Sequence, residues 1–116
     1  MDYKQEIINK INAKQDFTYN LTPNKNRYIV SQKSVYKGFN PSLQINLLED
    51  VFNILERTYN NFDSLGGWYD KKTKLYYLDL NLHFAGLSTA LKMAKVKEQN
   101  AIFDSKKGIV IYLNNL

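Results

Sequence analysis

The chain has 116 residues, of which 44% are hydrophobic and 14% aromatic, with no cysteine and a formal net charge of +5. This length suits one domain, and we expect residues 1–116 to form it. The lack of cysteine excludes disulfides and thiolate metal sites, and the basic charge excludes a mimic of DNA, which would be strongly acidic.

The first ten residues, MDYKQEIINK, contain acidic side chains and no apolar run of signal-peptide length. No stretch approaches the roughly 18 apolar residues that a membrane-spanning helix needs. We therefore expect a soluble, cytoplasmic protein without a membrane partner.

The N-terminal half predicts a helix, two short strands and a long helix. Apolar residues at helical spacing predict the first helix over residues 3–13. Alternating apolar and polar residues within 14–26 predict a short strand and a turn, and residues 27–32 predict a second strand. The clearest periodicity in the chain, from Ser42 to Tyr59, predicts the long helix.

Glycine and proline mark the expected chain reversals. Gly38 and the Asn40–Pro41 pair should end the second strand. Gly66 and Gly67 should form a tight turn that leads from the long helix into the next strand, since glycine adopts backbone conformations that other residues avoid.

The segment 67–83 predicts a β-hairpin around the polar turn DKKTK. Side chains alternate between the two faces of a strand, so one set of the return strand should face the core and the other should face away. The set that we expect in the core is Tyr76, Leu78, Leu80 and Leu82.

Residues 88–99 predict a third helix, with Ser88 or Thr89 as its N-cap and Asn100 as its C-terminal stop. Two short strands, AIFD and GIVIYL, should follow it. Strands grouped as hairpins predict a mainly antiparallel sheet with about three helices. The expected fold is therefore α+β, with a C-terminal ββαββ unit.

Few side chains suit catalysis. His83 is the only histidine, and a lone histidine at a strand end is more often structural than catalytic. Asp70, Asp79 and Asp104 could hold a divalent cation if they met, but two of them open turns, where aspartate bonds to the backbone. We expect no catalytic residue, no metal and no cofactor, and hence a protein that is not an enzyme.

Lysines and aromatics support two binding hypotheses. The lysines lie in two expected turns and on the third helix, and they would form a basic patch for phosphates if these elements shared an edge. Trp68, Tyr69, Tyr76 and Tyr77 could then stack on bases. The alternative explanation is ordinary: lysines are common in solvated turns, and tyrosines of a strand often complete the core.

The second hypothesis is a protein-binding module, because tyrosine-rich surfaces supply rigid interface anchors. The candidate anchors are Tyr28, Tyr36, Phe39, Tyr69 and Tyr77. The residues that we expect at the partner-binding site are Tyr69, Lys71, Lys72, Tyr77, Lys92 and Lys95.

The segment 28–104 contains the motifs YIVSQ, GFNPSL, LGGWYD, YYLDLNLHF and ALKMAKVKEQNAIFD. It resembles a loosely defined family of small proteins and domains from bacteriophages and other mobile elements. In that family a Gly-Gly/Ala-Trp strand precedes a Tyr-Leu-Asp strand, a helix with an Ala-Leu pair, and Asn-Gln-x-Ala-Ile-Phe/Tyr-Asp. Here Gln99–Asn100 reverses the Asn-Gln order.

The resemblance brings no catalytic residues. It implies a phage or mobile-element origin, and small proteins of that origin often antagonise host immunity. The implied function is a non-enzymatic inhibitor of a bacterial defence system, similar to anti-CRISPR proteins, which binds an effector protein or ribonucleoprotein in the host cytoplasm. The alternative is a nucleic-acid-binding accessory protein of a phage or mobile element.

Overall fold

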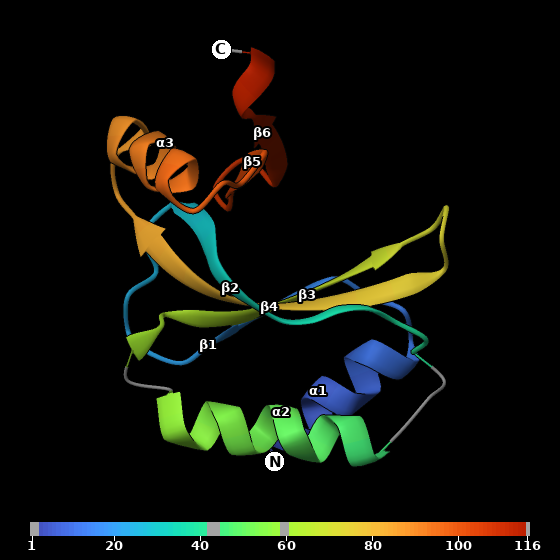
Figure 1. Cartoon of the computed structure of the whole chain (residues 1–116). Coiled ribbons are helices and arrows are strands. Elements are labelled where there is room, and N and C mark those ends of the chain that lie inside the picture. The colour runs from blue at the N-terminus through green and yellow to red at the C-terminus, as the bar shows by residue number, and fades with distance from the viewer. Residues whose placement is uncertain (1–2, 42–44, 59–60, 116) are drawn as a thin grey trace.

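The computed structural model describes residues 3–41, 45–58 and 61–115 (Figure 1). Its helices are α1 (Tyr3–Asn12), α2 (Ile45–Thr58) and α3 (Leu87–Val96). Its strands are β1 (Phe17–Asn20), β2 (Tyr28–Phe39), β3 (Ser64–Asp70), β4 (Leu75–Phe84), β5 (Ala101–Asp104) and β6 (Ile109–Tyr112), and a 3-10 turn, η2 (Leu113–Asn115), follows β6. The α+β fold with an antiparallel sheet is thereby confirmed.

The six strands form one sheet in the order β1-β3-β4-β2-β5-β6. All pairs of neighbours are antiparallel. Along the chain β3, β4, α3, β5 and β6 follow one another as a ββαββ segment, as expected. In the sheet, however, β2 lies between β4 and β5, so this segment is not a contiguous unit.

Two hydrophobic clusters lie on one face of the sheet. The first packs α1 and α2 against Tyr76, Leu78 and Leu80 of β4, and the second packs α3 near Phe84 of the same strand. Even-numbered residues of a strand share one face, so all three helices cover the same face. The twist of the sheet carries the two clusters to different sides of the molecule (Figure 1).

Strand β2 is longer than predicted, because Gly38 does not end it. Gly38 has φ of +67° and lies within the strand. The pairing of β2 with β4 shifts register at three places, between Ser31 and Phe39. Such bulges accommodate an extra residue and bend a strand without ending it.

The prediction of a turn at Gly66–Gly67 is wrong, because both residues lie inside β3. A Cβ atom on Gly67 would lie 2.1 Å from Cε1 of Phe17 and 2.7 Å from the hydroxyl of Tyr76. Glycine is therefore needed here for close packing of aromatic rings on the strand and not for a chain reversal.

The boundaries of α3 also differ from the prediction. Gly86 is the N-cap of α3 and no side chain caps it, so the expected Ser88 or Thr89 cap is wrong; the C-cap is Lys97. Residues 42–44 and 59, including Leu43 and Tyr59 of the predicted long helix, lie outside the described residues. No helix in the described ranges is long and apolar enough to cross a membrane.

Candidate functional site

The face of the sheet opposite the helices, which we call the open face, carries a set of exposed side chains. Trp68 pairs with Tyr77, an odd-numbered residue of β4, so both point away from the cluster under α1 and α2. In β6, Val110 pairs with Phe103 and Tyr112 with Ala101. Phe103 pairs with Ile29 of β2, and Ile29 pairs with His83 of β4. Paired residues point to the same face of the sheet, so Val110 and Tyr112 lie on the same face as the odd-numbered residues of β4. This face of the sheet therefore runs from β3 to β6, but Ile29 and His83 between its ends are buried, so its exposed side chains lie at two separate ends.

Trp68 and Tyr77 stack face to face at one end of the open face, so each ring covers one face of the other. Their ring centroids are 4.2 Å apart and their planes differ by 10°. The indole N–H of Trp68 donates to Oδ2 of Asp79 at 3.3 Å, which fixes the direction of the ring. Trp68 is 43% exposed, so an aromatic surface is available to a partner.

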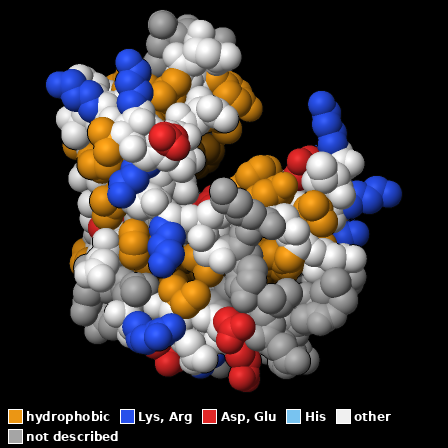
Figure 2. Space-filling model, in the orientation of Figure 1, with side chains coloured by type: hydrophobic (Ala, Val, Ile, Leu, Met, Phe, Trp, Pro, Cys, Tyr) orange, Lys and Arg blue, Asp and Glu red, His pale blue; other side chains and the backbone are white. Residues whose placement is uncertain are grey.

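Strand β6 forms the apolar part of the open face at its other end. Val110 is 50% exposed and Tyr112 is 52% exposed, although Ile111 between them packs against the cluster under α3. In the space-filling view the molecule is hollowed between the lobe of α3, β5 and β6 and the β3–β4 hairpin, and hydrophobic side chains lie on both sides of this hollow (Figure 2). The open face is thus concave.

The lysine-bearing elements, which would form a basic patch only if they shared an edge, are divided between the two lobes. Residues 71–74 connect β3 to β4 near Phe39, whose partner is Tyr76, while residues 105–108 connect β5 to β6 near Tyr28, whose partner is Asp104. The two turns therefore lie at opposite ends of β2. Basic side chains project from the hairpin tip and, separately, from the upper lobe (Figure 2).

The structure separates the six residues predicted at the partner site. Lys71, Lys72 and Tyr77 lie on the β3–β4 hairpin, whereas Lys92 and Lys95 lie exposed on α3. Tyr69 faces the helix-covered side, where it packs against the core and its ring lies 6.4 Å from that of Tyr76. The hairpin residues, without Tyr69, are those that border the open face.

Other predicted aromatic contacts belong to the interior. Tyr76 is fully buried, so the proposal that it stacks on bases is wrong. Tyr28 is 9% exposed and Phe39 packs against the first cluster. The side chain of Tyr36 lies outside the described residues.

The three candidate acids have separate structural partners. Oδ1 of Asp70 accepts the backbone N–H of Lys72 at 2.9 Å, and this bond lowers the pKa of Asp70. Asp104 accepts two bonds from Arg27, at 2.8 and 2.7 Å, which lower the pKa of Asp104 to about 2. Among the residues whose positions are described, no three histidine, aspartate or glutamate side chains gather as metal ligands.

His83 and Ser64 form a buried pair between β4 and β3. Ser64 Oγ lies 2.7 Å from His83 Nε2, and the two residues are 0% and 5% exposed. Asp63 accepts the backbone N–H of His83 at 2.9 Å, so this carboxylate binds the main chain and not the imidazole. Because the hydroxyl is fully buried, the pair joins two strands and is closed to a substrate.

The burial of this pair corrects the predicted pattern of β4. Asn81 and His83 were expected to face away from the core, yet both are buried, while Leu82 is only half-buried. Asn81 donates to Ser64 Oγ at 3.1 Å, and Asn24 donates to the carbonyl of His83 at 3.2 Å. Hydrogen bonds from neighbouring segments therefore make polar burial favourable on this part of the strand.

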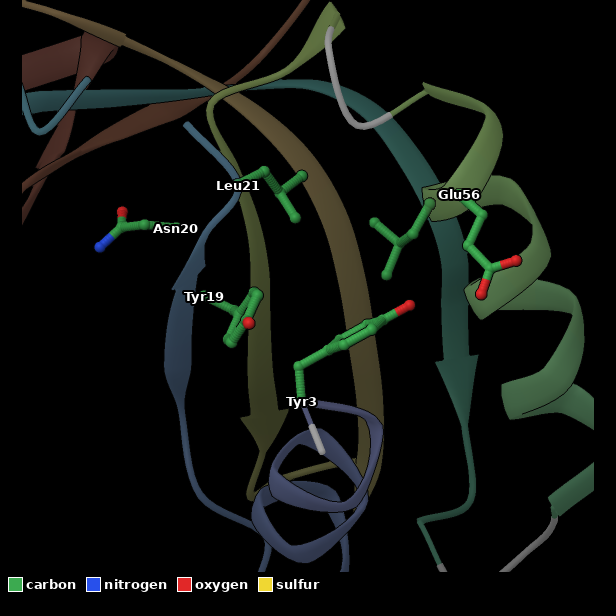
Figure 3. A pocket seen from close by; sticks show the side chains of 6 residues that line it. Tyr3, Tyr19, Asn20, Leu21 and Glu56 are labelled. Atoms are coloured by element: carbon green, nitrogen blue, oxygen red, sulfur yellow. The ribbon is translucent and has the colours of Figure 1, made fainter. Parts of the chain in front are cut away.

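A shallow cavity of about 310 Å³ lies between α1, α2 and the end of β1 (Figure 3). Tyr3 projects from α1 across its floor, with its ring 5.7 Å from that of Tyr19. Glu56 borders the cavity and pairs with Lys4 at 3.2 Å. This mainly apolar hollow could receive one apolar side chain of a partner.

Comparison of the chain with protein-family models, with curated proteins and with solved structures finds no match in any of the three. Val110 and Tyr112 were not among the residues predicted at the site, because an apolar strand pattern is the same for a central and an edge strand. The available signal was the run GIVIYL beside two lysines.

Proposed function

We propose that this protein acts by stoichiometric, non-catalytic binding of a partner, with the open face as its docking surface. The observation that carries the proposal is the distribution of exposed apolar side chains. Of five large hydrophobic residues exposed in the described ranges, three lie on the open face: Trp68, Val110 and Tyr112. Tryptophan and tyrosine are the residues that most often contribute the binding energy of interfaces.

The partner class that we propose is an effector protein or ribonucleoprotein of a bacterial defence system, as the resemblance to phage and mobile-element proteins implies. The charge distribution supports an acidic contact surface on that partner. Lys71 and Lys72 are exposed at the tip of the hairpin that borders the hollow, and lysines at the rim of an interface accelerate association with an acidic surface.

The test combines the protein with purified defence effectors and measures complex formation by size-exclusion chromatography and effector activity in parallel. Trp68→Ala and Tyr77→Ala should each weaken binding by roughly 30-fold, the usual cost of about 2 kcal/mol for an interface hot spot. Val96→Ala is the matched control, since Val96 is 74% exposed but lies on α3. Effectors that stay fully active with excess protein, or a Trp68→Ala variant that binds normally, would refute the proposal.

A second candidate is binding of single-stranded nucleic acid, which the exposed Trp68 of the stacked pair favours because a base can stack on the outer face of an aromatic ring. Three lysines occupy the adjacent turn, Lys71, Lys72 and Lys74. Neutralising about three phosphates predicts a slope of roughly −2 in log K against log salt for a single strand. Quenching of Trp68 fluorescence by an oligonucleotide would measure it, and no binding at about 50 mM salt would exclude this candidate.

A further inference from the structure

Strand β6 is an edge of the sheet with little protection against pairing. It is last in the strand order, and no strand in the described residues pairs with its outer side. Natural edge strands are commonly shielded by lysine, proline or bulges, but Ile109–Tyr112 reads IVIY. The opposite edge, β1, differs: its exposed residues are the polar Thr18 and Asn20, and Phe17 and Tyr19 pack against the core.

The backbone of β6 presents a defined set of groups at this edge. The N–H of Leu113 donates to the carbonyl of Asn100 at 2.9 Å. In an antiparallel pair the residues that exchange hydrogen bonds alternate with residues that do not. Ile109 and Ile111 therefore bond toward β5, and the N–H and C=O groups of Val110 and Tyr112 point outward.

We propose that β6 pairs with β6 of a second copy of this chain, antiparallel and with the twofold axis at Ile111. In this register Val110 lies opposite Tyr112 of the partner subunit, and by symmetry Tyr112 lies opposite Val110 of the partner subunit. Each of these two pairs exchanges two backbone hydrogen bonds, so four form in total. The two six-stranded sheets become continuous. Val110 and Tyr112 of each copy then share the open face, where both are exposed in the single chain.

The charges near β6 are compatible with this register. Lys106 and Lys107 precede β6, and in an antiparallel pair they lie beside the C-terminal end of the other copy. Lys107 of one copy is four residues from the axis, so the two Lys107 side chains are separated by roughly 26 Å at about 3.3 Å per residue. This exceeds the Debye length of about 8 Å at physiological salt, so the lysines do not oppose pairing.

The first test measures the mass of the full chain by sedimentation over about 1–200 µM. A strand contact this short is smaller than a standard interface, and we expect a dissociation constant on the order of 10 µM. Val110→Pro removes an outward N–H and leaves the bonds to β5 in place, so it should weaken dimerisation at least 100-fold. Thr18→Pro is the matched control, because Thr18 occupies the equivalent outward position on β1.

A second test is independent of the proline variants. Ile111→Cys should form a disulfide-linked dimer on mild oxidation, since residues facing each other in a non-hydrogen-bonded pair have Cα atoms about 4.5 Å apart. The chain contains no other cysteine. Ile109→Cys should not cross-link. In this register residue 109 lies opposite residue 113 of the other copy, four residues from the second introduced cysteine.

A monomeric mass at 200 µM together with no cross-link in Ile111→Cys would overturn the proposal, as would equal cross-linking of Ile109→Cys. If the wild type is monomeric and Val110→Pro no longer binds an effector, then β6 pairs with a strand of that effector. This outcome would refute the proposal that β6 pairs with a second copy of the chain. The proposed docking function is tested by Trp68→Ala and Tyr77→Ala, so either proposal can fail while the other stands.

Discussion

Gly67 illustrates how one residue in this fold determines the approach of two strands. It pairs with Phe17 of β1, and the Phe17 and Tyr76 side chains occupy the space where a Cβ would lie. A pair of glycines in a sequence usually indicates a turn, and here the requirement is space on the strand surface. Part of this requirement comes from Phe17, which is 50 positions away in the chain.

We predict that Gly67→Ala lowers the free energy of unfolding by about 2 kcal/mol, because overpacking forces the aromatic rings or the strand to move. Urea titration followed by circular dichroism measures it. Gly86→Ala is the control: its nearest contact would be Thr89 Oγ1 at 3.9 Å, and we expect only the cost of a poorer N-cap, about 0.5–1 kcal/mol. Equal effects of the two substitutions would show that the space at Gly67 is not limiting.

The buried His83 predicts a pH dependence of stability. Burial lowers the pKa of His83 below its ordinary value near 6.5, and its buried Nδ1 atom has no hydrogen-bond partner among the described residues. The folded protein therefore binds this proton less readily than the unfolded chain does. Its contribution to stability is complete above about pH 6.5 and declines as the pH falls through the lowered pKa.

The urea midpoint of the wild type should therefore decrease between pH 7 and pH 5. In His83→Gln, which keeps a hydrogen-bonding group near Ser64, this decrease should be much smaller. A variant with the same pH profile as the wild type would mean that His83 does not cause it.

At the scale of elements, the ion pair between Arg27 and Asp104 joins the start of β2 to the end of β5. Asp104 is 1% exposed and also accepts the backbone N–H groups of Lys106 and Lys107, at 3.1 and 3.2 Å. The pair therefore anchors the C-terminal hairpin to the central strands. The proposed edge β6 depends on this attachment, since β5 is the one strand of the described residues with which β6 pairs.

We predict that Asp104→Asn lowers the urea midpoint at pH 7 and lowers it much less at pH 2. The pKa of Asp104 is lowered by Arg27 to about 2, so its stabilising contribution is present above about pH 3.8 and is lost as the pH falls toward 2. Unfolding curves at the two pH values measure it. Asp70→Asn, in the exposed β3–β4 turn, is the control, and a loss at pH 7 equal to that of Asp104→Asn would contradict the assignment.

At the scale of the whole molecule, the two hydrophobic clusters are connected by β2 and β4. These strands make the longest pairing in the sheet, from Tyr28–Phe84 to Phe39–Tyr76. The continuous pairing predicts that the lobes unfold together, although the hollow of the open face separates them on the surface (Figure 2).

Ile102→Ala tests this cooperativity. Ile102 is 3% exposed in the cluster under α3, and its truncation should cost about 3 kcal/mol. Trp68 is the single tryptophan and reports on the distant β3–β4 hairpin. Its fluorescence and the circular dichroism should shift to the same lower urea midpoint. Separate transitions would show that the lobes unfold independently.

Local patterns in the sequence were sufficient for most elements of the fold and for the α+β class. The hairpin around residues 71–74, the strands AIFD and IVIY, and the central turns of the helices follow from periodicity and turn residues, which act between near neighbours. The lysines and Tyr77 of the candidate site were recognisable in the same way, because exposed turns and strand aromatics have clear local signals.

The tertiary structure alone decided where β2 lies, which half of β4 buries polar residues, and that β6 is an edge. Each of these depends on contacts between distant segments: β2 separates two hairpins, Asn24 and Ser64 satisfy polar groups on β4, and no strand in the described part of the chain covers β6. The alternation of apolar and polar residues predicts a strand, but it does not indicate which other strand pairs with it. For this reason the concave open face emerged only when the strands were ordered in space.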